Sequence, residues 1–207
     1  MDYRLSVMGG SFLLMLSMLT GCSSGASNSN ESDNNDLQVS SNEGRQSTDT
    51  LLSASMKQDY LDAINTIRAV TQDCGEEGIK PAVPALEWSD KIYMAAAEHS
   101  CDMATSNTFS HKGSNTSSDK TGKGLGRGSM ASERIAHHGY RWLYTGENIA
   151  AGANVDTVEE VVQMWLKSPG HCANMMSPDF KDVGMAMIED GNSDYIHYWT
   201  QNFAAPR

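Results

Sequence analysis

Four short motifs, widely spaced in the second half of this 207-residue chain, constrain its fold more than any other feature. Two of them carry a histidine, His111 and His171, and one carries Glu147. Distant polar residues in turn-rich motifs are typical of a site built from loops on a rigid scaffold, so we expect these three residues to share one site. The motifs are Phe109-Ser110-His111, Gly146-Glu147-Asn148-Ile149-Ala150, Ser168-Pro169-Gly170-His171-Cys172 with Trp165 before it, and Tyr198-Trp199-Thr200-Gln201-Asn202-Phe203.

Residues 1–21 have the form of a lipoprotein signal peptide. An apolar stretch from Leu5 to Leu19 follows Arg4, and at about 15 residues it is too short for an ordinary membrane-spanning helix. The small residues before Cys22 form a bacterial lipobox, so we expect cleavage before Cys22 and acylation of its thiol. An uncleaved membrane anchor is the alternative.

Residues 22–55 are expected to form a flexible tether that starts at the acylated Cys22. They are rich in Ser, Asn, Asp, Gly and Glu, and they hold too few large apolar side chains to offset the entropy of ordering. Such a segment spans about 30 Å on average. The remaining residues, 56–207, suit one compact domain.

The charge balance argues against a nucleic-acid partner. The chain has 26 acidic and 15 basic residues and a net charge of −11, whereas binding to a phosphate backbone requires a positive surface. The same charge disfavours simple adhesion to anionic lipids. A local basic exception, interpreted as a solvated loop, consists of Lys112, Lys120, Lys123, Arg127 and Arg134.

The hydrophobic pattern predicts a layered α+β domain. The first helix is expected to carry Met56, Tyr60, Ile64 and Ile67 on one face and to stop at Cys74-Gly75. Further helices are expected from Ser89 to Met103, from Ser129 to His138, and from a Thr157/Glu160 capping box through Trp165. Ser168-Pro169-Gly170 is expected to end the last of these helices and to place His171 just beyond it. Val183–Ile188 and Tyr195–Phe203 are predicted to form an antiparallel hairpin.

From Met56 to Phe203, the order of the motifs resembles the CAP superfamily, also called SCP. This superfamily includes cysteine-rich secretory proteins, antigen 5 and plant pathogenesis-related proteins. The resemblance implies an α/β/α sandwich with a mostly antiparallel central sheet, and one cleft that contains His111, Glu147 and His171. Ser168 stands where eukaryotic members carry a second glutamate, as in many bacterial members, and this removes a candidate ligand or general base.

Export makes disulfides permissible, and the mature domain holds Cys74, Cys101 and Cys172. Cys101 falls on an apolar helical face, where we expect a free cysteine buried as a small hydrophobe. Some bacterial relatives look similar at the other two positions, so the resemblance implies a disulfide between Cys74 and Cys172. This disulfide would pin the segment of His171 to the first helix.

The resemblance and the residue types together suggest a divalent-metal site at His111, Glu147 and His171. Histidine and carboxylate side chains suit Zn²⁺, and three protein ligands with an open position are usual in catalytic sites. Glu147 is the candidate catalytic residue, while Asn148 and Arg134 are expected to brace the loops around it. The alternative is a polar network that only orders loops.

The remaining histidines and glycines are expected to have no part in this chemistry. We interpret His99 as a satisfied core histidine and His197 as a strand surface residue. The glycine-rich segment 122–128 lacks the spacing of a phosphate loop and is interpreted as a mobile loop near the cleft entrance. The chain has no Gly-x-Ser-x-Gly elbow and no His-Glu-x-x-His motif.

Three functions remain open. The first is an envelope-anchored binding module for a sterol-like lipid, a peptide or a cell-wall fragment. The second is a metal-dependent hydrolase that acts on peptide, nucleic acid or envelope polymer. The third is a structural role with an idle cleft. Ser168 favours the first and third, and the leader places the protein in a bacterial envelope, outside the cytoplasm, on an outer membrane or at the surface.

Overall fold

The computed structural model describes residues 54–207. The predicted signal peptide (1–21), the acylation site Cys22 and the tether up to residue 53 lie outside the described residues. The first helix, α1 (Ala54–Arg68), begins slightly before the predicted domain boundary at residue 56. It ends at Arg68, so the predicted stop at Cys74-Gly75 is wrong, because the chain turns into the short strand β1 (Gln72–Asp73) before it reaches Cys74.

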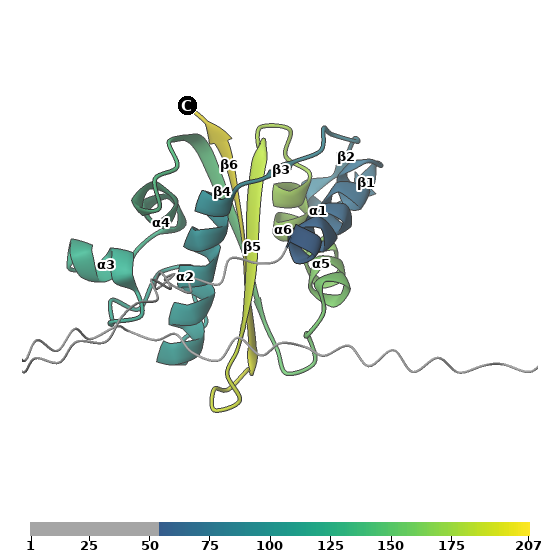
Figure 1. Cartoon of the computed structure of the whole chain (residues 1–207). Coiled ribbons are helices and arrows are strands. Elements are labelled where there is room, and N and C mark those ends of the chain that lie inside the picture. Colours follow the sequence, from purple (N-terminus) through teal and green to yellow (C-terminus); the bar gives the residue numbers. More distant parts are fainter. Residues whose placement is uncertain (1–53) are drawn as a thin grey trace, which may run out of the picture.

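A four-stranded sheet separates two layers of helices (Figure 1). Its strand order is β3-β5-β6-β4, with β6 antiparallel to both of its neighbours and only the short β3 parallel to β5. This confirms the predicted α/β/α sandwich with a mostly antiparallel sheet. The strands are β3 (Glu87–Trp88), β4 (Trp142–Ala151), β5 (Asp182–Glu189) and β6 (His197–Pro206).

Three helices cover each face of the sheet (Figure 1). On one face lie α2 (Asp90–Ser106), α3 (Lys120–Leu125) and α4 (Ala131–His137). On the other face lie α1, α5 (Val158–Leu166) and α6 (Pro169–Met175). Beside α1, a small hairpin joins β1 (Gln72–Asp73) and β2 (Ile79–Lys80) around the 3₁₀ turn η1 (Gly75–Glu77).

Because both faces are covered, β6 is buried along nearly its whole length. Its Trp199 and Phe203 pack in the main core with Trp165 of α5. The indole nitrogens of Trp165 and Trp199 donate to the carbonyls of Ile149 (3.0 Å) and Val155 (2.7 Å). Each large aromatic side chain is therefore buried without losing its hydrogen bond.

The capping box at the start of α5 is present. The Thr157 hydroxyl accepts from the backbone N–H of Glu160, and the Glu160 carboxylate accepts from the backbone N–H of Thr157, both at 3.2 Å. Two otherwise unpaired helix-end donors are satisfied in this way.

Two site motifs do not lie in loops, contrary to prediction. Glu147 and Asn148 lie within β4, where burial on both faces removes the alternating pattern that marks a strand. His171 and Cys172 lie inside α6, because Pro169 occupies the first turn of a new helix rather than only ending the previous one.

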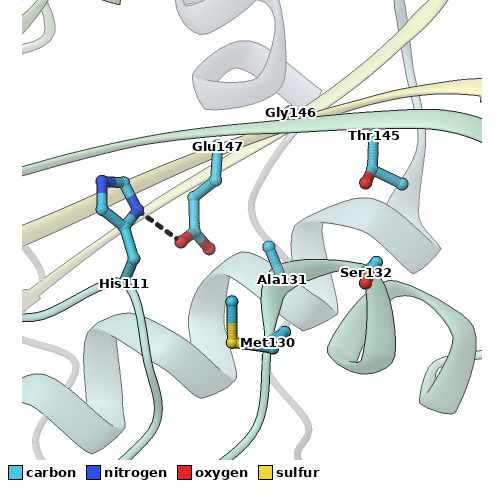
Figure 2. A pocket seen from close by; sticks show the side chains of 7 residues that line it. All are labelled: His111, Met130, Ala131, Ser132, Thr145, Gly146 and Glu147. Atoms are coloured by element: carbon cyan, nitrogen blue, oxygen red, sulfur yellow. Dashed lines mark hydrogen bonds and ion pairs between the residues drawn. The ribbon is translucent and has the colours of Figure 1, made fainter.

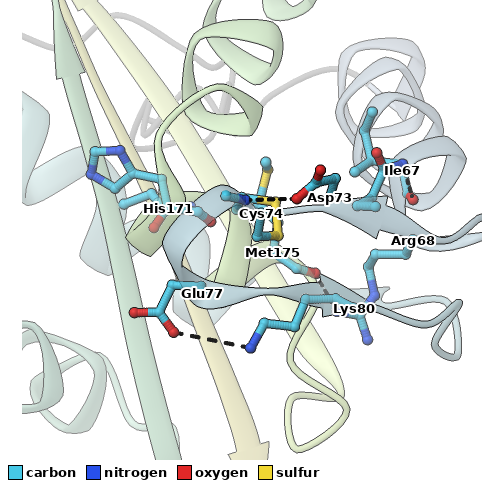
Figure 3. The surroundings of a disulfide bond; sticks show 12 residues. Ile67, Arg68, Asp73, Cys74, Glu77, Lys80, His171 and Met175 are labelled. Atoms are coloured by element: carbon cyan, nitrogen blue, oxygen red, sulfur yellow. Dashed lines mark hydrogen bonds and ion pairs between the residues drawn. A yellow bond between two sulfur atoms is a disulfide. The ribbon is translucent and has the colours of Figure 1, made fainter.

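The predicted disulfide between Cys74 and Cys172 is present, with a Cα–Cα separation of 5.5 Å (Figure 3). It joins the turn after β1 to α6, one residue from His171. Cys101 departs from prediction, because it is partly exposed rather than buried and is not a free thiol.

The glycine-rich segment is more ordered than predicted, since Lys120–Leu125 forms α3. Asp119 is its N-cap and accepts from the backbone N–H of Gly122 at 2.9 Å. Between residues 54 and 207, no helix is long and apolar enough to cross a membrane.

Candidate functional site

Glu147 lies at the centre of a buried polar network. Its side chain is only 4% exposed, yet both carboxylate oxygens have partners. Oε1 lies 2.9 Å from Nδ1 of His111, and Oε2 accepts from Nη2 of Arg134 at 2.7 Å (Figure 2 shows the His111 contact). The amide nitrogen of Asn202, oriented to face this carboxylate, donates to Oε2 at 3.0 Å.

Arg134 joins Glu147 to both ends of the loop that carries His111. This fully buried side chain of α4 donates to the carbonyl and hydroxyl of Ser129, at 3.0 and 2.9 Å, and to the carbonyl of His111 at 3.2 Å. Arg134 thus braces the loop through its ion pair with Glu147, as predicted. Its predicted place in a solvated basic loop is wrong, because the side chain is buried. A charge buried so deeply is tolerated only when it is paired.

A second buried carboxylate, Asp119, keeps the same loop folded. It accepts from the hydroxyl of Ser129 (2.6 Å) and from the backbone N–H groups of Asn115 and Ser129, both at 3.0 Å. Burial raises the pKa of Asp119, but these hydrogen bonds outweigh burial and hold it below its usual value. At Gly113 a Cβ would overlap the Asp119 carboxylate, so the loop closes around this group.

The charge state of Glu147 follows from its surroundings. Burial raises its pKa, but the hydrogen bond from His111 and the charge and hydrogen bond of Arg134 outweigh that effect, and the net pKa lies below the usual value. Glu147 is therefore an ionised carboxylate at neutral pH, and it acts as a hydrogen-bond acceptor only.

The geometry fixes which nitrogen of His111 faces outward. Since Glu147 only accepts, Nδ1 of neutral His111 donates to it, and the lone pair then lies on Nε2. The side chain of His111 is 54% exposed, and Nε2 has no hydrogen bond within residues 54–207. This is the arrangement in which a carboxylate orients a histidine toward a ligand or metal.

His99 is a second histidine beside Glu147, and sequence reasoning missed this contact. It is fully buried on α2, and its Nε2 lies 3.8 Å from Oε1 of Glu147. Neither ring nitrogen has a well-formed hydrogen bond within the described chain, although the backbone of Ser110 is near enough to favour a charged ring. Burial lowers the pKa of His99 to about 4 despite Glu147, so the ring is neutral. The predicted core placement is confirmed, but the predicted satisfaction of its nitrogens is wrong.

His171 lies half-buried on α6, and burial together with nearby His111 lowers its pKa. Asn148 on β4 holds this helix in place. Its Nδ2 donates to the His171 carbonyl at 3.2 Å and to Oε1 of Gln201 at 3.1 Å, and its Oδ1 accepts from Asn174 at 2.9 Å. The Cys74–Cys172 disulfide fixes the next residue (Figure 3), so His171 is anchored through its backbone on two sides.

Ser168 is the N-cap residue of α6, but its side chain makes no capping hydrogen bond. No carboxylate stands at this position to supply a further ligand or base. Among residues 54–207, no group of three or more His, Cys, Asp or Glu side chains is placed to hold a metal ion. Because Arg134 and His111 engage Glu147, the network fits Glu147 as the group that orients His111 rather than as a direct ligand.

A pocket of about 290 Å³ opens between β4 and the start of α4 (Figure 2). His111 and Glu147 line one part of it, and Ser132 and Thr145 lie apart from them in Figure 2. His171 is not among the lining residues, which are His111, Met130, Ala131, Ser132, Thr145, Gly146 and Glu147.

Two other histidines have structural contacts. His197 is buried, with Nδ1 3.2 Å from the carbonyl of Gly152, so its predicted surface position is wrong. Nε2 of His138 lies 2.8 Å from Oε2 of Glu98, which also accepts from Thr121.

The fold is thus an α/β/α sandwich in which a glutamate on β4 contacts a histidine from the loop between α2 and α3. The chain belongs to the Cysteine-rich secretory protein family (CAP), whose model matches residues 61–203. It is 30% identical to YkwD of Bacillus subtilis over 128 residues, which cover 62% of this chain and 41% of YkwD. It is 28% identical to the Bacillus subtilis membrane protein YlbC over 143 residues, covering 69% of this chain and 32% of YlbC.

Among solved structures, an extracellular SCP-domain protein from Bacillus anthracis aligns with a TM-score of 0.50 and 25% identity. The alignment covers 72% of this chain and 40% of that protein. The chain therefore spans less than half the length of each of these three relatives.

Proposed function

We propose that this chain is an extracytoplasmic CAP-domain lipoprotein, anchored to a bacterial envelope through acylated Cys22, that binds a ligand at the cleft bearing His111 and His171. The extracellular relative from Bacillus anthracis and the form of the leader support the location. The observation that carries the binding role is the fixed orientation of His111, whose Nδ1 is held by ionised Glu147 while Nε2 faces outward.

The ligand classes that we propose are a peptide, a small lipid or a cell-wall fragment. A chain of net charge −11 is a poor partner for nucleic acid. We propose that the lipid anchor attaches the protein to the membrane, and stable anchoring takes two or more acyl chains.

His111 and His171 are the residues that would hold a divalent cation such as Zn²⁺. Neutral imidazoles are good ligands for this ion, and the lowered pKa of His171 keeps its ring neutral at pH 7. A bound cation would supply Lewis-acid chemistry. Glu147 would contact Nδ1 of His111 without contacting the cation, and it would thereby set the tautomer of His111 and raise the basicity of Nε2.

Binding is favoured over the alternative, a metal-dependent hydrolase acting on peptide, nucleic acid or cell-wall polymer. A general base needs a free basic atom near the reacting group. Both oxygens of Glu147 are already engaged, and position 168 supplies a hydroxyl in place of an acid. In the proposed cleft, the imidazoles of His111 and His171 would face the ligand, and position 168 adds no carboxylate beside them.

The test is a calorimetric titration of Zn²⁺ into the chain from Ser23 onward, at pH 7.5 and pH 5.5. We expect binding at pH 7.5 that is lost in His111→Ala and in His171→Ala and that weakens at pH 5.5, because protons compete for imidazole. His137→Ala is the matched control, since this exposed histidine lies outside the cleft. Absence of binding to the folded wild type would overturn the metal proposal, and equal binding by all three variants would place the ion elsewhere.

A further inference from the structure

We propose that the outer edge of β4 at Thr145–Glu147 binds an extended peptide as an added strand, with one peptide side chain in the neighbouring pocket. This deepens the proposed binding function and rests on it, since it names the ligand class and its place beside His111 and Glu147.

β4 is an edge strand, paired with β6 on one side only. The carbonyl of Glu147 accepts from Asn174 (3.3 Å) and the carbonyl of Ile149 accepts from the Trp165 indole (3.0 Å), so both point away from β6. Along a strand, the main-chain N–H and C=O groups of every second residue point to the same side. Thr145 lies two residues before Glu147, so its N–H and C=O point to the same outer edge as the carbonyl of Glu147.

The open part of this edge is a short window. A bulge between Trp142 and Tyr144 interrupts the ladder on one side, and Asn174 and Trp165 block the carbonyls from Glu147 onward. Within residues 54–207, no partner bonds the main-chain N–H or C=O of Thr145 or the N–H of Glu147 at this edge. Proteins usually block such edges, as this one does beyond Glu147.

Three main-chain groups are thus available in the order that an added antiparallel strand uses. The residue opposite Thr145 would donate one hydrogen bond to its carbonyl and accept one from its N–H. A second residue, two positions along the peptide, would accept from the N–H of Glu147.

The side-chain geometry connects this edge to the pocket. Residues directly opposite each other in neighbouring strands project on the same face. A peptide residue opposite Thr145 therefore projects on the face of Thr145 and Glu147, which is where the pocket of about 290 Å³ lies (Figure 2). The peptide residue two positions further along, opposite Glu147, projects on the same face and toward His111.

The pocket fits a single side chain better than a lipid. Its volume lies just below the usual range of ligand pockets, which run from about 300 to 1,000 Å³. Its wall includes Met130 and Ala131, and the hydroxyls of Ser132 and Thr145 have no hydrogen bond within the described chain. Tyr144, which is 54% exposed, adds apolar surface on the opposite face of the strand.

A single extended peptide fits this window better than a second copy of the chain. The window is only three residues long and a bulge bounds it on one side, and short edges next to bulges disfavour strand pairing between folded copies. It is also flanked by α4 and α6, so a partner with helices of its own would meet them.

The test uses capped pentapeptides Ac-Ala-Ala-X-Ala-Ala-NH₂ with X = Ala, Val, Leu, Ser, Lys or Glu, titrated into the ¹⁵N-labelled chain from Ser23 onward in EDTA. We expect saturable shifts of the Thr145 and Glu147 amides at millimolar peptide, with a preference among the X residues. N-methylation of X removes one donor and is expected to weaken binding about tenfold.

The matched variants are Thr145→Pro, which removes the outward N–H at a position where an edge strand tolerates proline, and Thr145→Val, which keeps it. We expect Thr145→Pro to abolish binding and Thr145→Val to retain it. If Thr145→Pro does not fold, the N-methylated peptides on the wild type decide. Absence of shifts, or shifts unaffected by N-methylation, would overturn the proposal. So would shifts at Thr145 that depend on protein concentration without peptide, because they would indicate a second copy.

EDTA separates this test from the zinc titration. Peptide binding in EDTA supports the strand site whether or not zinc binds. Zinc binding without peptide binding would leave the cleft proposal standing and remove only the strand site.

Discussion

Nδ1 of His111 lies 2.9 Å from Oε1 of Glu147, and this contact joins the exposed histidine of the cleft to a buried, ionised carboxylate. The other carboxylate oxygen accepts from Arg134 at 2.7 Å. Glu147 thus belongs to the scaffold of the site, where it sets the orientation of His111. Its own oxygens are not free for a substrate.

Arg134→Met tests whether the scaffold depends on this ion pair. The substitution leaves the Glu147 carboxylate buried beside fewer donors, and removing one partner of a buried pair costs about 3–5 kcal/mol. We expect that loss in the free energy of unfolding, measured with urea, and partial recovery in the double variant Arg134→Met/Glu147→Gln. The matched control is Arg127→Met, which breaks an exposed pair with Glu133 and should have little effect. Equal effects of the two single variants would contradict the assignment.

His99 makes a specific contribution to the pH dependence of stability. Its folded pKa is about 4, below the usual 6.5, so the unfolded chain binds more protons between these values. The contribution is complete above pH 6.5 and is lost as pH falls toward 4, and at full size it is about 3 kcal/mol. In urea unfolding at a series of pH values, the wild type should lose more stability than His99→Gln over this window. Parallel curves would show that His99 is not buried neutral.

Gly146 is required by the close approach of an aromatic ring. A Cβ at this position would lie 2.6 Å from the Phe180 ring, so Gly146→Ala should cost about 1–3 kcal/mol in unfolding free energy. Gly170→Ala is the control, because nothing lies within 4 Å of a Cβ there. A neutral Gly146→Ala would mean that Phe180 is free to move aside.

The sequence predicted the layers of the fold better than it predicted the local structure of the site motifs. Helical spacing and capping signals located the helices, because those signals are local. The strand that carries Glu147 was missed, since β4 is covered on both faces and its small residues show no alternation. His99 was assigned to the core because its helical face is apolar, and only the folded sheet brings Glu147 within 3.8 Å of it.

The Cys74–Cys172 disulfide should support both stability and the position of His171. It closes a loop with a sequence separation of 98, and the chain-entropy model gives about 4–5 kcal/mol for such a loop. We expect the variant Cys74→Ala/Cys172→Ala to lose stability of that order in urea. It should also broaden or shift the His171 ring signals in NMR spectra of the folded protein. Unchanged ring signals would show that Asn148 alone fixes α6.

The lipid anchor is tested on the full chain expressed in a bacterium. Acylation at Cys22 predicts that the protein partitions into detergent and gains the mass of its acyl groups, and that Cys22→Ala abolishes both. Ser23→Ala is the control, because it leaves the thiol in place. Detergent partitioning of Cys22→Ala without an added lipid mass would favour an uncleaved anchor instead.

The ring nitrogens of His111 test the central claim most directly. In a long-range ¹H–¹⁵N spectrum at pH 8, Glu147 should hold the proton on Nδ1 and leave Nε2 unprotonated. Glu147→Ala should release the ring to the mixture of tautomers seen in free histidine, while Glu133→Ala, outside the network, should not. A proton on Nε2 in the wild type, or spectra that Glu147→Ala leaves unchanged, would contradict the account.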